Sequence, residues 1–104
     1  MKPNLKIQRA RLDERVKLFL QLLGELINAR RLELKMSQAM VAEMAGLSRT
    51  AVYNIEHGLV DERSTTLMRV AWALKMSHAG VVATLEHLML PPEHRPQKRG
   101  LKTL

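Results

Sequence analysis

The 104-residue sequence contains no cysteine and only one residue each of tryptophan, tyrosine and phenylalanine. The absence of cysteine excludes disulfide bonds and thiolate metal sites, and it suits a reducing cytoplasm. Because aromatic residues are scarce, the core must be built from aliphatic side chains and methionine. Apolar residues make up 46% of the chain, which is enough for one core, and this length is typical of one domain.

Long apolar runs are also missing. No run approaches the ~20 apolar residues that a membrane-spanning helix requires. The charged N-terminus is not followed by the apolar segment and small-residue cleavage site of a secretion signal. We therefore expect a cytoplasmic protein that has no membrane partner.

The net charge of +7 is concentrated at the two ends of the chain. Residues 1–11 hold four basic residues and no acid, and residues 91–104 hold four basic residues and one acid, so residues 12–90 sum to zero. The ends are either solvated tails or arms that follow a polyanion and release its counterions. We predict a basic N-terminal arm at 1–12, a helical domain at 13–90 and a basic flexible tail at 91–104.

The hydrophobic pattern predicts an all-α fold, because no segment alternates like a β-strand. Apolar residues recur at helical spacing from Asp13, a suitable N-cap, to about Glu33, which predicts a long first helix. Four shorter helices follow, and their expected N-caps are Ser37, Ser48, Ser64 or Thr65, and Ser77. The methionines are interpreted as core filler, with Met40, Met44 and Met68 placed where helices should pack.

The stretch SQAMVAEMAGLSRTAVYNIEHG, from Ser37 to Gly58, holds two short helical patterns separated by Ala45-Gly46. Gly46 lies where a left-handed residue ends a helix at low cost, and Ser48 can cap the next helix. Two helices joined by a short turn that contains Gly form a helix-turn-helix arrangement. In the second helix the expected inward residues are Ala51, Val52 and Ile55, and the outward residues are Arg49, Thr50, Tyr53 and Asn54.

The longer run LGELINARRLELKMSQAMVAEMAGLSRTAVYNIEHG, followed by TLMRVAWAL, resembles the lambda-repressor/Cro-like (XRE-type) helix-turn-helix family. The likeness covers roughly residues 23–76 and includes Ile27, Arg31, Ser37-Gln38, Ala45-Gly46, Ser48, Val52, Ile55-Glu56, Gly58 and Val70-Ala71. Val41, where the family mostly has Leu, and Trp72, where it usually has a polar residue, depart from the pattern. The resemblance implies a five-helix DNA-binding domain used as a dimer, here with an extended first helix.

The resemblance further implies that the helix from Ser48 to about His57 enters the major groove of double-stranded DNA. Arg49 can then make two hydrogen bonds to guanine, Asn54 can do likewise with adenine, and the Thr50 methyl group can touch thymine. Tyr53 is expected at the DNA backbone or a base edge. The alternative is an ordinary solvated helix face.

Phosphate contacts are expected at helix N-termini. Ser37 and Gln38 begin one helix and Ser48 begins the next, and by resemblance Gln38 also supports the recognition helix. Arg63 and Ser64 are either contacts across the groove or solvated loop residues.

The resemblance also implies a structural ion pair between Arg31 and Glu56. If this pair is partly exposed, it contributes only about 0–1 kcal/mol to stability.

Trp72 lies off the core stripe of its helix, so it is either covered by the first helix or part of a dimer interface. The full set of expected interface residues is Phe19, Leu20, Trp72, Met76, Val82, Leu85 and Met89. Two-fold symmetry would make the operator an inverted repeat with half-sites roughly 34–36 Å apart.

The sequence offers little support for an enzyme. The histidines His57, His78, His87 and His94 show no close pairing, and no acid pair or glycine-rich phosphate loop is present, so we expect no catalytic residue, metal or cofactor. The favoured function is a homodimeric transcriptional regulator, most simply a repressor. The alternatives are an antitoxin that binds its own promoter and neutralises a toxin protein, and an interaction module that no longer binds DNA.

Overall fold

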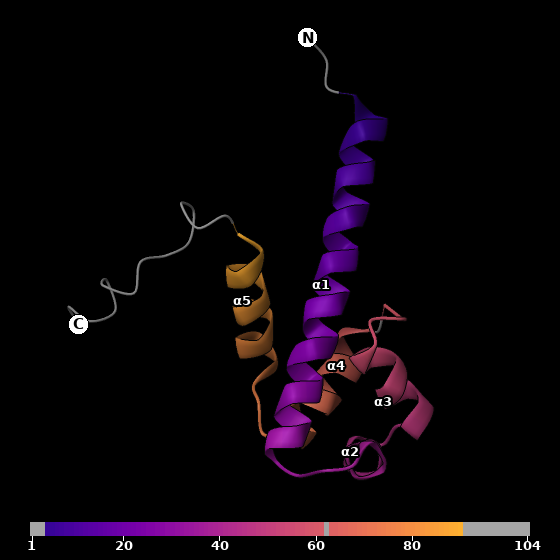
Figure 1. Cartoon of the computed structure of the whole chain (residues 1–104), viewed down its shortest axis with the longest axis vertical. Helices are drawn as coiled ribbons and strands as arrows, with labels where there is room; N and C mark the ends of the chain where they lie inside the picture. The colour runs from indigo at the N-terminus through magenta and orange to yellow at the C-terminus, as the bar shows by residue number, and fades with distance from the viewer. Residues whose placement is uncertain (1–3, 62, 91–104) are drawn as a thin grey trace, which may run out of the picture.

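The computed structural model describes residues 4–61 and 63–90, so the predicted tail at 91–104 lies outside the described residues. Five helices form the described chain: α1 (Leu5–Glu33), α2 (Gln38–Ala45), α3 (Arg49–Glu56), α4 (Ser64–Ala73) and α5 (His78–Met89). The helices α2, α3 and α4 gather around the C-terminal half of α1, and α5 runs beside it (Figure 1). The described ranges contain no strand, so the all-α prediction is confirmed.

The start of α1 was predicted wrongly. The helix begins at Leu5, because the Asn4 side chain accepts hydrogen bonds from the backbone N–H of Lys6 at 3.0 Å and of Ile7 at 3.2 Å. Asparagine is one of the best N-caps, and no proline or glycine interrupts the helix before Asp13. Asp13 therefore lies inside the helix, and the basic arm predicted at 1–12 is helical from Leu5 onward.

The caps of the shorter helices follow the local sequence, with one exception. Ser37, Ser48 and Ser77 each accept a hydrogen bond from a backbone N–H in the first turn of the following helix. Gly46 ends α2 with φ 70°, as the left-handed prediction requires. The prediction of a Ser64 or Thr65 cap for α4 is wrong, because Arg63 occupies the N-cap position and makes no side-chain cap hydrogen bond.

The core is aliphatic, as predicted from the scarcity of aromatic residues. Its completely buried large side chains are Val41, Val52, Val70, Leu74 and Leu85. The prediction that Met40, Met44 and Met68 fill the core is wrong, because each is about half exposed. The described part of the chain has no helix that combines the length and apolar character of a membrane span.

Gly24 allows α1 to touch the end of α3. A Cβ atom at this position would lie 2.7 Å from the Ile55 carbonyl oxygen and would also collide with the Glu56 carbonyl. Because both neighbours are backbone atoms, they cannot swing aside as a side chain would. This contact fixes how the C-terminal end of α3 sits on the rest of the protein.

Candidate nucleic-acid interface

The helix α3 divides sharply into a buried and an exposed face. Val52 and Ile55 are fully buried in the core. On the other face, Arg49, Thr50 and Tyr53 are exposed. Asn54 is only half-buried, so it lies nearer the edge of the exposed face than expected.

The exposed face borders a hollow of about 260 Å³ between the N-terminal ends of α2 and α3. Its lining residues are Gln38, Arg49, Thr50 and Tyr53. The structure thus brings together three residues expected to contact bases or their edges and one expected to contact phosphate. Asn54 does not line this hollow, although it lies on the adjacent turn of the helix.

A buried carboxylate anchors α3 to α1. Glu56 Oε2 accepts a hydrogen bond from Arg31 Nε at 2.7 Å, and Oε1 accepts one from Arg31 Nη2 at 3.0 Å. The side chains are only 12% and 1% exposed, respectively, so the expectation of a partly exposed, weak pair does not apply. Arg31 Nη1 also donates to the Met36 carbonyl oxygen, which ties the pair to the turn before α2.

Two amide side chains complete this cluster. Asn28 Nδ2 donates to Glu56 Oε1 at 2.8 Å, and Gln38 Nε2 donates to the same oxygen at 3.2 Å. Gln38 also lines the exposed hollow, so it connects the buried cluster to the outward surface. Asn28 was missed at the sequence level, where the only available signal was a polar residue beside the apolar stripe of a long helix.

The cluster changes the acid–base properties of both charged groups. Burial by itself would raise the pKa of Glu56, but the hydrogen bonds from Arg31, Asn28 and Gln38, with the charge of Arg31, hold that pKa below its ordinary value. The hydrogen bond to Glu56 raises the pKa of Arg31, against burial and with the help of the Glu56 charge. Both groups are therefore charged at neutral pH, and the pair is structural.

Tyr53 is held by His57, a residue for which no role at this face was expected. The His57 ring stacks on the Tyr53 ring with a centroid distance of 4.0 Å and an interplanar angle of 24°. His57 Nδ1 also lies 2.9 Å from the Tyr53 carbonyl oxygen. His57 is the C-cap of α3 and follows Tyr53 by four residues, so the two rings lie on the same side. This spacing was the signal that the sequence offered.

The remaining expected phosphate contacts lie around this face. The Ser37 and Ser48 hydroxyl oxygens cap α2 and α3, so their structural role is established. Arg63 and Ser64 are exposed at the start of α4 and do not line the hollow.

The expected dimer residues are dispersed. Trp72 is 76% exposed, so the alternative that α1 covers it is wrong. Leu85 belongs in the core and not on an interface, because it is completely buried. Phe19, Leu20 and Met89 line a different hollow, while Met76 and Val82 are half-buried.

Within residues 4–61 and 63–90, no three His, Asp or Glu side chains are grouped so that they could hold a metal ion. His94 lies outside these ranges.

A helix-turn-helix family model matches residues 27–79, slightly more than half of the chain. This chain belongs to the XRE-type helix-turn-helix family. As a member it is a DNA-binding transcriptional regulator, and its ligand is double-stranded DNA. None of the curated proteins compared with the chain matches it.

The fold of this helix-turn-helix protein is similar to a solved structure. The high-resolution crystal structure of the restriction-modification controller protein C.AhdI from Aeromonas hydrophila matches with a TM-score of 0.55 and 23% sequence identity. The match covers 66% of this chain and 97% of that one. At this identity the likeness concerns the fold alone, and it supports the five-helix architecture described above.

Proposed function

We propose that this helix-turn-helix protein is a repressor that binds a palindromic operator as a homodimer. The observation that supports this proposal best is the exposed row of Arg49, Thr50 and Tyr53, which borders one hollow together with Gln38. The opposite face of the same helix is locked in the core by Val52 and Ile55. A helix supported in this way can enter the major groove without rearranging the domain.

The side chains on this face suit base recognition. Arg49 has the planar donor geometry that matches guanine O6 and N7, and the amide of Asn54 matches adenine N6 and N7. The Thr50 methyl group suits the methyl group of thymine. Tyr53 stacks on His57 and would contact the DNA backbone or a base edge.

Phosphate contacts would orient the recognition helix. The N-terminal turns of α2 and α3 begin at Gln38 and Arg49, where backbone N–H groups and the helix dipole favour an anion. Arg63 and Ser64 are exposed beyond the loop and would meet the backbone on the other side of the groove. These contacts would set register and affinity but would carry no sequence information.

The short recognition helix favours binding as a dimer. The helix α3 has 8 residues, so it is about 12 Å long and reaches only a few base pairs. Two copies related by a two-fold axis would read an inverted repeat with half-sites roughly 34–36 Å apart. Such a dimer would cover the site and exclude other proteins, which is the simplest form of repression.

The direct test is to select binding sites from random DNA and then measure the affinity of variants. We expect Arg49→Ala and Asn54→Ala each to lose ~1–3 kcal/mol of binding free energy on the selected site and little on random DNA. The control is Arg63→Ala, which should weaken both kinds of DNA similarly because phosphates are common to both. Equal losses on both kinds of DNA for Arg49→Ala would show that the helix face does not read bases, and a reporter not silenced by the selected site would contradict repression.

A further inference from the structure

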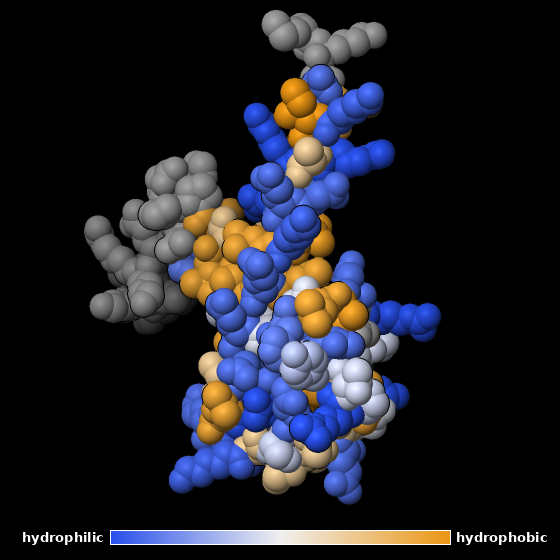
Figure 2. All heavy atoms as spheres, turned by 45° about the vertical axis from the view of Figure 1, so that its right-hand side comes forward, coloured by the Kyte–Doolittle hydropathy of each residue, from blue (hydrophilic) through white to orange (hydrophobic). Residues whose placement is uncertain are grey.

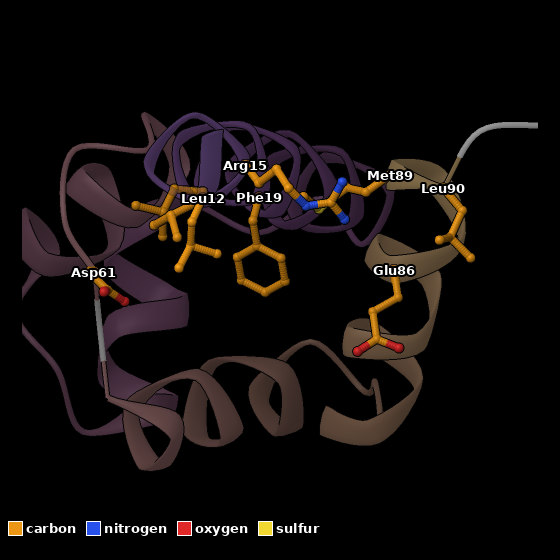
Figure 3. Close-up of a pocket in the computed structure, with 9 residues that line it drawn as sticks. Leu12, Arg15, Phe19, Asp61, Glu86, Met89 and Leu90 are labelled. Atoms are coloured by element: carbon orange, nitrogen blue, oxygen red, sulfur yellow. The ribbon is translucent and has the colours of Figure 1, made fainter. Parts of the chain in front are cut away.

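A second hollow lies between α1 and α5, and it shares no lining residue with the proposed DNA-binding face. This α1–α5 groove has a volume of about 510 Å³. Phe19 points from α1 into it, with Glu86 of α5 on one side and Asp61 on the other (Figure 3). The α1 wall also includes Leu12, Val16 and Leu20, and Met89 and Leu90 close the other side. The interior is therefore apolar, and its charged lining is two carboxylates against one guanidinium, that of Arg15.

The N-terminal half of α1 is a surface segment, and three of its residues, Leu12, Arg15 and Val16, form part of the groove wall. Every residue from Asn4 to Leu18 is exposed, and in Figure 1 this half extends beyond the other helices. Leu5, Leu12 and Val16 are 74%, 59% and 40% exposed. They are spaced by seven and then four residues, which places them on one side of the helix.

This exposed stripe continues into the core. Val16 is followed at the same helical spacing by Leu23 and Ile27, which are 3% and 2% exposed. Figure 2 shows apolar atoms both beside α1 at the level of α5 and near the N-terminal end of α1. One stripe thus contributes its C-terminal end to the core of its own chain and presents its N-terminal end to solvent.

A helical segment of this length is marginal in water unless an apolar face is packed against a partner. The segment is also basic, because residues 5–17 hold Lys6, Arg9, Arg11, Arg15 and Lys17 against Asp13 and Glu14. A basic helix with an apolar stripe is complementary to an apolar groove in which the two carboxylates outnumber the one cation, Arg15. Residues 5–11 lie on the same rigid helix as the α1 wall of the groove, so they cannot turn back into the groove of their own chain, but they can enter that of a second copy.

We propose that the α1–α5 groove receives the N-terminal half of α1 from a second copy of this chain. The exchange is reciprocal about a two-fold axis, as a homodimer requires, so this inference rests on the homodimer in the proposed function. The two α1 helices cross antiparallel between Leu12 and Val16. This crossing packs the partner's Leu12 against Val16 in the groove wall and brings the partner's Arg9 opposite Phe19, on the side of Glu86.

The first test compares two substitutions on opposite sides of α1 by light scattering after size exclusion. Val16 is 40% exposed on the stripe and Leu18 is 43% exposed away from it, so the pair is closely matched. We expect Val16→Glu to reduce the mass from dimer to monomer and Leu18→Glu to leave the dimer intact. A monomeric wild-type protein, or the same mass for both variants, would overturn the assignment. The finding that another protein or another segment of the chain fills the groove would also overturn it.

The second test exchanges charges between the helix and the groove. Arg9→Glu and Glu86→Lys should each weaken the dimer, whereas an equimolar mixture of the two variants should form a heterodimer. This recovery arises because opposite charges then face each other at both symmetric contacts. Recovery only when both substitutions are in one chain would place the contact within a protomer and overturn the proposal.

DNA binding separates this inference from the proposed function. Val16→Glu should lose the tight binding of an inverted repeat while it keeps sequence-dependent binding to a single half-site. Arg49→Ala should keep the dimer mass and lose sequence preference. If the masses do not change as predicted but Arg49→Ala still loses sequence preference, only the groove assignment is overturned. If the masses change as predicted but Arg49→Ala keeps its sequence preference, only the assigned DNA-binding face is overturned.

Discussion

At the scale of single residues, Glu56 links the core to the DNA-facing surface. It lies at the end of α3 and accepts hydrogen bonds from Arg31, Asn28 and Gln38, which come from α1 and α2. Three helices are therefore held in one relative orientation by one carboxylate. Because charges in such a site have left water, the balance between pairing and burial decides their effect on stability.

We predict that Arg31→Met destabilises the fold by about 3–5 kcal/mol, because it leaves a buried carboxylate without its cation. The double variant Arg31→Met/Glu56→Leu should regain much of this loss, since no buried charge remains. Urea unfolding of the two variants and the wild type measures both effects. A double variant as unstable as Arg31→Met would mean that the loss comes from the missing ion pair and not from the unpaired buried carboxylate of Glu56.

Because the pKa of Glu56 is lowered in the folded state, the contribution of this residue to stability depends on pH. Above the pKa of a glutamate in the unfolded chain, about 4.3, the Glu56 carboxylate is ionised in both states and its full contribution to stability is present. The contribution is lost as the pH falls through the lower pKa of the folded state. The difference in unfolding free energy between wild type and Glu56→Gln should therefore shrink below about pH 4, and a difference independent of pH would contradict the assigned shift.

At the scale of helices, local signals account for much of what could be predicted. Ser37, Gly46 and Ser48 define the turn between α2 and α3 through their own backbone preferences, so they needed no knowledge of the fold. The start of α1 was ambiguous because Asn4 and Asp13 are both capable caps, and only the helix between them decides the choice. The close approach at Gly24 depends on where α3 ends in space, which the sequence of α1 does not contain.

We predict that Gly24→Ala destabilises the protein by about 1–3 kcal/mol, although alanine is the better helix former by about 1 kcal/mol. The reason is the collision with the Ile55 and Glu56 carbonyl groups, which are backbone atoms. The exposed neighbour Glu25 offers a control, and Glu25→Ala should change stability by no more than about 0.5 kcal/mol. Thermal unfolding that ranks Gly24→Ala as stable as the control would refute the close contact.

At the scale of the whole molecule, the helix-turn-helix and its exposed face were predictable, whereas the pattern of covered surfaces was not. Met40, Met44 and Met68 have helical spacing suitable for a core, yet the crossing of α2 and α4 leaves them half exposed. Leu85 of α5 is completely buried in the shared core, although Glu86 and Met89 of the same helix line a groove. Which side of a helix is covered depends on how all five helices pack together, and the sequence of a single helix does not contain that arrangement.

The most direct test of base reading by Arg49 is a cycle that pairs one protein variant with one changed base pair. The selected operator would be altered at each position in turn, and the affinity of the wild type and of Arg49→Ala measured for every altered site. We predict one guanine whose replacement costs the wild type ~1–3 kcal/mol but costs Arg49→Ala almost nothing, because the variant has already lost that contact. If every base change costs both proteins the same, Arg49 does not read a base and the exposed face of α3 is not the recognition surface.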